Sequence, residues 1–213
     1  MNPGPINPTT RLADLPVLVF DCETTGLDVK KDVIVSVGGV EMLGGQINRD
    51  AVFEQLINPG RPIPPESRKI HGISDDMVKD APTFLDVWRK HIEPAFTGRV
   101  IVGHNIGFDI AHLCKATSAV GIRWVVPPTF DTLLLFAALE PKRGAVSLDD
   151  LAKEFRVDIE GRHTALGDAL TAAGVYHALL KRLMSQGIET LEQAEKLCKK
   201  PKAILRMQKR AGW

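Results

Sequence analysis

The chain has 213 residues, of which 44% are hydrophobic and 25% are charged, and its formal net charge is +1. This length suits one substantial hydrophobic core but is short for two, so we expect a single domain with additions at its ends. The sequence has no long apolar run and its N-terminus has no signal-peptide pattern, which argues against a membrane protein and predicts a cytoplasmic location. The cysteines Cys22, Cys114 and Cys198 are too scattered for a disulfide framework or a zinc site.

The first part of the chain predicts an irregular arm followed by strands. Residues 1–14 contain three prolines and no apolar periodicity. The expected strands cover Val17–Asp21, Val33–Glu41 and Val52–Ile57. The Gly44-Gly45 pair between the last two is typical of a hairpin turn, so these strands should be antiparallel.

Further along the chain, strands alternate with helices. A strand is expected over Val100–Gly103, and Trp124–Phe130 could supply a fifth strand, broken by Pro127-Pro128. The expected helices cover Phe108–Val120, Thr132–Leu139, a segment begun by Ser147 with Asp150, and Ala165–Met184. An antiparallel group followed by this alternation predicts a mixed sheet flanked by helices.

Positive charge is concentrated near the C-terminus. From residue 181 onward there are nine lysines and arginines but three glutamates, and the densest stretch is Lys196–Arg210. Such a segment suits a polyanionic partner, although a solvated face is the more common explanation of a charge run. We expect residues 186–213 to form a basic helical extension.

The stretch VLVFDCETTGLD ends a buried strand in two acids. Because side chains alternate along a strand, Asp21 and Glu23 should share one face while Cys22 points to the other. Like charges so close raise one another's pKa unless a cation neutralises them, and magnesium prefers such oxygen ligands. A D-x-E pair by itself, however, more often caps the turn that follows it.

Two other stretches supply acids where further ligands would be needed. GHNIGFD places Asp109 in the first turn of the helix after the Val100–Gly103 strand. HTALGD places His163 just before the long helix and Asp168 inside it. Each has a simple structural explanation, because the helix dipole favours a first-turn acid and a lone histidine is usually packed or solvated. The combination with D-x-E is more specific than any one part.

In this order, D-x-E with T-T-G-L, N-x-x-F-D and H-x-x-x-x-D resemble the DEDD superfamily of 3′-to-5′ exonucleases. They resemble in particular its histidine-bearing branch, which includes the proofreading (epsilon) subunit of bacterial DNA polymerase III. The similarity extends to the phrases INPGRPIP, IHGISDDMV and FDTL. It implies an α/β fold, namely a ribonuclease-H-like mixed five-stranded sheet in the order 3-2-1-4-5 flanked by helices. The exonuclease domain would cover residues 15–185, between the arm and the extension.

The resemblance also implies a catalytic site. Asp21, Glu23, Asp109 and Asp168 would hold two divalent ions, Mg²⁺ or Mn²⁺, and His163 would take the proton from the attacking water. Histidine suits this role because an unperturbed imidazole, with a pKa of about 6.5, is largely neutral near pH 7.

Residues near the metals are implied to bind the substrate, namely Thr24, Thr25, Gly26, Leu27, His104, Asn105 and Phe108. Leu27 is similar to the family's apolar wedge between the last two bases, and Phe108 could stack on a base. Two alternatives stay open, since Leu27 could instead cover the core and Phe108 could anchor its helix. His71 and Asp131 are expected to be structural.

The expected activity is hydrolysis of single-stranded or frayed 3′ ends of DNA, with release of nucleoside 5′-monophosphates. An RNA exonuclease of the same superfamily is the close alternative, because the catalytic residues do not read the 2′-OH. A non-catalytic module that binds a polymerase or nucleic acid would have lost a metal ligand, and none is missing. A phosphatase acting on mononucleotides is a further alternative. A DNA polymerase partner and the oligomeric state stay open.

Overall fold

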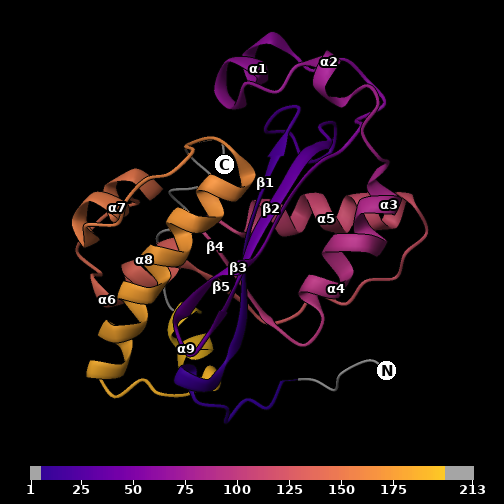
Figure 1. Ribbon diagram of the computed structural model, residues 1–213. Coiled ribbons are helices and arrows are strands. Elements are labelled where there is room, and N and C mark those ends of the chain that lie inside the picture. The colour runs from indigo at the N-terminus through magenta and orange to yellow at the C-terminus, as the bar shows by residue number, and fades with distance from the viewer. Residues whose placement is uncertain (1–5, 200–213) are drawn as a thin grey trace.

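A computed structural model of the protein describes residues 6–199 and shows one mixed sheet between layers of helices (Figure 1). The strand order is β3-β2-β1-β4-β5, which confirms the expected 3-2-1-4-5 sheet. The strands are β1 (Pro16–Thr24), β2 (Ile34–Leu43), β3 (Gln46–Leu56), β4 (Val100–Gly103) and β5 (Thr129–Asp131). β1 pairs antiparallel with β2 and β2 with β3, whereas β4 is parallel to both β1 and β5.

The predicted extents of four strands are wrong, and β4 is predicted correctly. β1 continues past Asp21 to Thr24, so both acids of the D-x-E pair belong to the strand. β2 is displaced from Val33–Glu41 to Ile34–Leu43. β3 begins at Gln46 rather than Val52, because its polar first half pairs with β2 as an exposed sheet edge. β5 is only three residues long, since the two prolines before it have no N–H to donate to a sheet.

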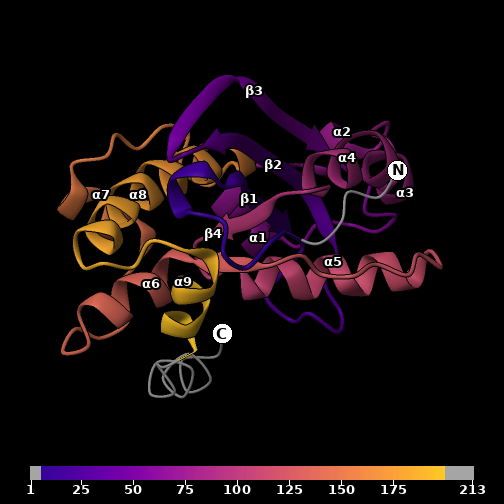
Figure 2. The same cartoon turned by 90° about the horizontal axis from the view of Figure 1, so that it is seen from below.

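Two groups of helices cover the two faces of the sheet (Figures 1 and 2). One face packs against α6 (Thr132–Leu139), α7 (Leu148–Phe155), α8 (Ala165–Ser185) and α9 (Leu191–Cys198). The other packs against α5 (Gly107–Ala119) and the run formed by α3 (Phe84–Val87), the π-helical turn η2 (Trp88–Ile92) and α4 (Glu93–Phe96). Two short helices, α1 (Pro65–His71) and α2 (Asp75–Val78), lie beyond the end of β1 and β2 (Figure 1).

The predicted helices are found, with ends that differ by about one residue at α5 and α8. α6 has the predicted bounds. Ser147 begins α7 through a capping box with Asp150, as its sequence indicates. Local side-chain signals therefore place the helix starts around the site.

Side-chain alternation along β1 divides the core. Val17 and Val19 belong to the cluster that contains α8, whereas Leu18 and Phe20 belong to the cluster on the α5 side, where Cys22 follows them. The two acids of β1 continue the series of Val17 and Val19 and therefore share the side of the sheet that α8 covers.

Gly38 allows α8 to lie against the sheet at this point. It is the β2 residue paired with Asp21, and a Cβ atom on it would collide with the backbone of Ala165 and Leu166 at the start of α8. The missing side chain thus brings the first turn of α8 next to the end of β1.

The two ends of the described chain pack on each other. Arg11 forms a β-bridge with Thr190, next to a 3-10 turn η1 (Leu12–Asp14), and the Leu12 and Leu191 side chains are both 1% exposed. The division into an arm, a domain over 15–185 and an extension stays a prediction, and most of the basic stretch Lys196–Arg210 lies outside the described residues. Within residues 6–199, no helix combines the length and apolar character needed to cross a membrane.

Candidate active site

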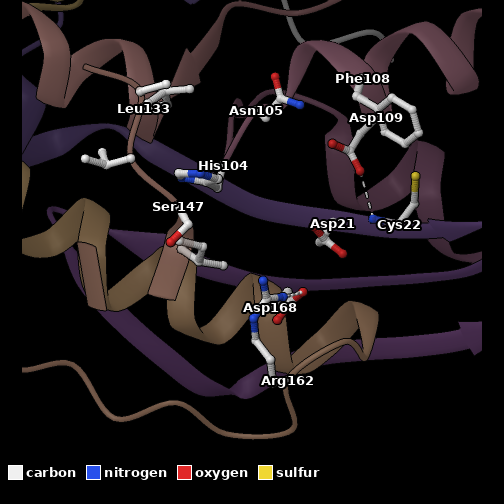
Figure 3. Close-up of a pocket in the computed structure, with 13 residues that line it drawn as sticks. Asp21, Cys22, His104, Asn105, Phe108, Asp109, Leu133, Ser147, Arg162 and Asp168 are labelled. Atoms are coloured by element: carbon white, nitrogen blue, oxygen red, sulfur yellow. Dashed lines mark hydrogen bonds and ion pairs between the residues drawn. The ribbon is translucent and has the colours of Figure 1, made fainter. Parts of the chain in front are cut away.

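The predicted catalytic residues come from separate segments that meet at the C-terminal end of β1, and Figure 3 shows Asp21, Asp109 and Asp168 among them. Asp21 and Glu23 lie on β1 itself, Asp109 lies in the first turn of α5, and Asp168 lies in the first turn of α8. His163 precedes Thr164, whose side chain caps α8. Because β1 and β4 are parallel, the start of α5 after β4 reaches the same edge of the sheet as the end of β1.

The carboxylates form a compact cluster. One oxygen atom from each of Asp21, Glu23 and Asp168 lies within 4.8 Å of the others. Asp109 lies beside this trio, where its Oδ1 accepts a hydrogen bond of 2.9 Å from the backbone N–H of Cys22 (dashed line in Figure 3). The structure therefore brings together all four acids that the motifs predicted.

Burial and repulsion make these carboxylates hard to ionise. Burial, followed by the charges of its carboxylate neighbours, raises the pKa of Asp21 well above its usual range. Burial, with Asp168 and Asp109, raises the pKa of Glu23 to about 8, and burial raises the pKa of Asp109 to about 7. Burial also raises the pKa of Asp168, although a neighbouring arginine opposes this. The cluster offers only oxygen ligands, and the repulsion between its carboxylates would be relieved by positive charge. Both properties suit a hard divalent cation.

The arginine is Arg162, which the motifs did not predict to be part of the site. Its guanidinium enters the site from the loop before α8 (Figure 3), forms an ion pair with Asp168, and forms another with Asp149 at 2.6 Å. The only sequence signal was its position next to His163. An arginine in a loop is normally solvated, so nothing local predicted that this side chain points inward.

His163 lies at the edge of this cluster. Its backbone is left-handed, with φ of 63°, and its N–H donates to Oδ1 of Asp168 over 3.3 Å. Its ring Nδ1 is 3.4 Å from Nη1 of Arg162. His163 is half-buried and does not line the adjoining pocket, in contrast to Arg162.

That pocket, of about 430 Å³, has an acidic end and an apolar wall. Phe108, Leu133 and the segment 145–148 contribute to the wall, and only Phe108 among them was predicted to contact substrate. Phe108 also packs on His112, with ring centroids 4.5 Å apart, so it anchors its helix while it lines the pocket. The 145–148 segment carried no sequence signal beyond the Ser147 cap.

His104 and Asn105 line the same pocket, on a loop that Asp131 holds in place. Oδ1 of Asp131 accepts hydrogen bonds of 2.9 Å from the backbone N–H groups of both Asn105 and Leu133. Asn105 has a left-handed φ of 57°, so this bond fixes an unusual backbone turn. Burial, with the charge of Arg162, lowers the pKa of His104 to about 4, so its ring is neutral near pH 7. Asp131 therefore has the structural role expected for it.

The Thr-Thr-Gly turn is held by bonds within the protein. Oγ1 of Thr24 donates to the carbonyl of Gly26 at 2.7 Å, and Oγ1 of Thr25 donates to Oδ1 of Asp32 at 3.0 Å. A Cβ atom on Gly26 would collide with the Asp32 carboxylate, which gives this glycine a packing role. Leu27 is 62% exposed, so the alternative that it covers the core is wrong. Nucleotide contacts by these residues stay a prediction.

Comparison with known proteins agrees with this geometry. A sequence profile described as Exonuclease matches residues 18–176. The chain belongs to the exonuclease family. This exonuclease chain is 39% identical over 184 residues to the DNA polymerase III subunit epsilon-like protein of Rhodobacter capsulatus, covering 85% of the chain and 26% of that relative. It is 34% identical over 183 residues to the PolC-type DNA polymerase III of Lacticaseibacillus paracasei, covering 85% of the chain and 12% of that relative.

The exonuclease chain thus spans about a quarter or less of these relatives' lengths. Among solved structures, exonuclease X in complex with 5′-overhanging duplex DNA superposes with a TM-score of 0.66 at 25% identity, covering 85% of this chain and 99% of that one. Exonuclease I of E. coli, in complex with a dT13 oligonucleotide, shares the fold with a TM-score of 0.69 at 16% identity, covering 82% and 43% of the two chains. The family resemblance of the motifs and the predicted sheet are confirmed.

Proposed function

We propose that the chain is a 3′-to-5′ exonuclease domain that acts on single-stranded or frayed 3′ ends of DNA and releases nucleoside 5′-monophosphates. The observation that carries this proposal is the convergence of Asp21, Glu23 and Asp168, with Asp109 beside them, at one end of an exonuclease fold. DNA is favoured over RNA because relatives are named for DNA polymerase III and exonuclease X was solved with DNA.

The residues present fit two divalent ions, Mg²⁺ or Mn²⁺. All four side chains offer oxygen atoms, and the burial and carboxylate charges that raise the pKa values of Glu23 and Asp109 favour the binding of positive charge. Asp21, Glu23, Asp109 and Asp168 would hold the ions. When bound, such a pair supplies charge stabilisation to the attacking and leaving oxygens of an in-line displacement at phosphorus.

His163 is proposed to be the general base. Its backbone N–H donates to Asp168 and it is half-buried, so it lies beside a carboxylate that would hold an ion. It would accept the proton of the attacking water, while the neighbouring acids are committed to the ions.

The terminal nucleotide is proposed to bind between the exposed Leu27 and the pocket that Phe108, His104 and Asn105 line. Leu27 offers an apolar surface to a base, and the half-buried ring of Phe108 offers another. Thr24, Thr25 and Gly26 would contribute mainly by holding the turn that presents Leu27.

Matched DNA and RNA oligonucleotides, each labelled at the 5′ end, test the proposal when incubated with Mg²⁺ or Mn²⁺. Stepwise shortening from the 3′ end, mononucleotide products and loss of activity in chelator are expected, with DNA degraded faster. Faster cleavage of RNA would favour the RNA exonuclease, and hydrolysis of free mononucleotides would favour the phosphatase. No cleavage of either polymer would favour the non-catalytic module.

A DNA polymerase is proposed as a partner because two relatives of the chain are named for DNA polymerase III. The two named relatives are much longer than this chain, so a polymerase could be joined to such a domain or bound by it. Co-elution of the chain with a replicative polymerase in gel filtration would support a bound partner, and separate elution would count against it.

A further inference from the structure

Arg162 supplies positive charge in the middle of the acidic cluster. Its guanidinium bonds to Asp168 through Nη1 and to Asp149 through Nε, so both edges of the group are engaged. Its side chain is 30% exposed, whereas that of Asp168 is 8% exposed.

The position of Arg162 conflicts with a metal ion. Asp168 belongs to the trio whose oxygen atoms lie within 4.8 Å of one another, so the oxygen that pairs with Arg162 belongs to a side chain that an ion would need. Two positive groups cannot share one carboxylate without repulsion in this partly buried site. A bound ion would therefore have to displace the guanidinium.

The loop that carries Arg162 has an unusual backbone on both sides of that residue. Gly161 and His163, on either side of it, both have left-handed backbones, with φ of 59° and 63°. For a residue other than glycine this conformation is strained, so His163 is held there by its surroundings. Its N–H bond to Asp168 is long, at 3.3 Å, and would give way with the neighbouring ion pair.

We propose that Arg162 is an internal counter-ion that pairs with Asp168 in the metal-free protein, competes with divalent ions for that carboxylate, and is released with its loop when they bind. The proposal rests on the proposed metal site. Metal binding then also frees His163, the adjacent residue, from its bond to Asp168. The alternative is a structural arginine that merely keeps the carboxylates together.

The two roles predict opposite effects on metal affinity. If Arg162 competes, Arg162→Gln should tighten binding of Mn²⁺, measured by calorimetry at low ionic strength, by about threefold or more. If it is structural, removing it lets the carboxylates repel one another, and binding should weaken. Arg162→Lys retains the charge but cannot pair with Asp168 and Asp149 through two edges at once, so its Mn²⁺ affinity should lie between those of wild type and Arg162→Gln.

Arg49→Gln is the matched control. Arg49 forms an exposed ion pair with Glu160 at 3.0 Å, so this variant loses the same charge close to the same loop but outside the cluster. Its Mn²⁺ affinity should equal that of wild type. In chelator, Arg162→Gln should melt below Arg49→Gln, and Mn²⁺ should raise its melting temperature by more.

Unchanged or weaker Mn²⁺ binding by Arg162→Gln would overturn the competition. If Arg162→Gln folds too poorly for calorimetry, the melting shifts decide. An equal Mn²⁺-induced shift in Arg162→Gln and Arg49→Gln then overturns the proposal. If the wild-type protein binds no Mn²⁺, the proposed metal site itself is wrong. If wild type and Arg162→Gln bind Mn²⁺ equally well, the metal site stands and only the competition by Arg162 is wrong.

Discussion

Replacing Asp21 by asparagine should stabilise the metal-free protein while it removes the nuclease activity. Asp21 is half-buried, and desolvation, followed by the charges of Asp109, Asp168 and Glu23, raises its pKa. Glu23, in the same cluster, has a pKa of about 8 instead of 4.5. At pH 7 such a group is kept protonated in the fold, at a cost of about 3 kcal/mol relative to the unfolded chain.

Asp21→Asn retains the shape of the side chain and removes one ionisable partner from the cluster. We expect the free energy of unfolding in chelator to rise by about 2 kcal/mol. The gain is smaller than about 3 kcal/mol because neighbouring groups and water already offset part of the ionisation cost in the wild-type protein. For a domain of this size that corresponds to a rise of about 4–8 °C in melting temperature. Activity should fall by more than about 100-fold, because loss of a direct ligand costs more than loss of a residue that only orients one.

Thermal melts in chelator and with Mn²⁺, together with oligonucleotide cleavage, measure both effects. Asp76→Asn is the control, because the Asp76 side chain is 91% exposed and the charge change is the same. Its melting temperature in chelator should stay close to that of wild type, and its activity should be normal. Asp21→Asn melting below wild type in chelator would refute the repulsion argument, and normal cleavage by Asp21→Asn would refute the metal assignment.

Three further predictions follow from the site. His163→Ala should lower turnover by about 10²- to 10⁴-fold while Mn²⁺ affinity by calorimetry stays near wild type; rescue of turnover by excess metal would contradict the role as base. Because the folded pKa values of Glu23 and Asp109 are raised, to about 8 and about 7, the folded protein binds more protons than the unfolded chain. Melting temperature in chelator should therefore fall from pH 5 to pH 8, and Mn²⁺ should abolish the decline, whereas a flat profile in chelator would be inconsistent with these shifts. Gly38→Ala should force the start of α8 away from β2 and lower the free energy of unfolding, measured with denaturant, by about 1–3 kcal/mol. The rate of oligonucleotide cleavage should also fall, because Asp168 moves with α8. Wild-type behaviour in both assays would count against the close packing.

Local sequence patterns are sufficient to predict which residues share a face of a strand and where helices begin. Asp21 and Glu23 lie on one side of β1 because side chains alternate along any strand, whatever it packs against. The Thr83–Asp86 and Ser147–Asp150 capping boxes form between residues three positions apart, so they too are encoded locally. The order of the acidic motifs was enough to indicate the family and, through it, the sheet order.

The neutralisation and enclosure of the site depend on contacts between segments that are far apart in the chain. Arg162 enters the cluster and His163 lies at its edge because of how one loop packs between α8 and α7, which carries Asp149. Thr25 is held by Asp32, across a turn whose shape no motif specified. Electrostatic and packing energies depend on distances between segments remote in the chain, whereas the patterns in a sequence report periodicity and short-range hydrogen bonds. The four carboxylates of the site could therefore be predicted from the sequence, whereas the position of the Arg162 side chain among them could not.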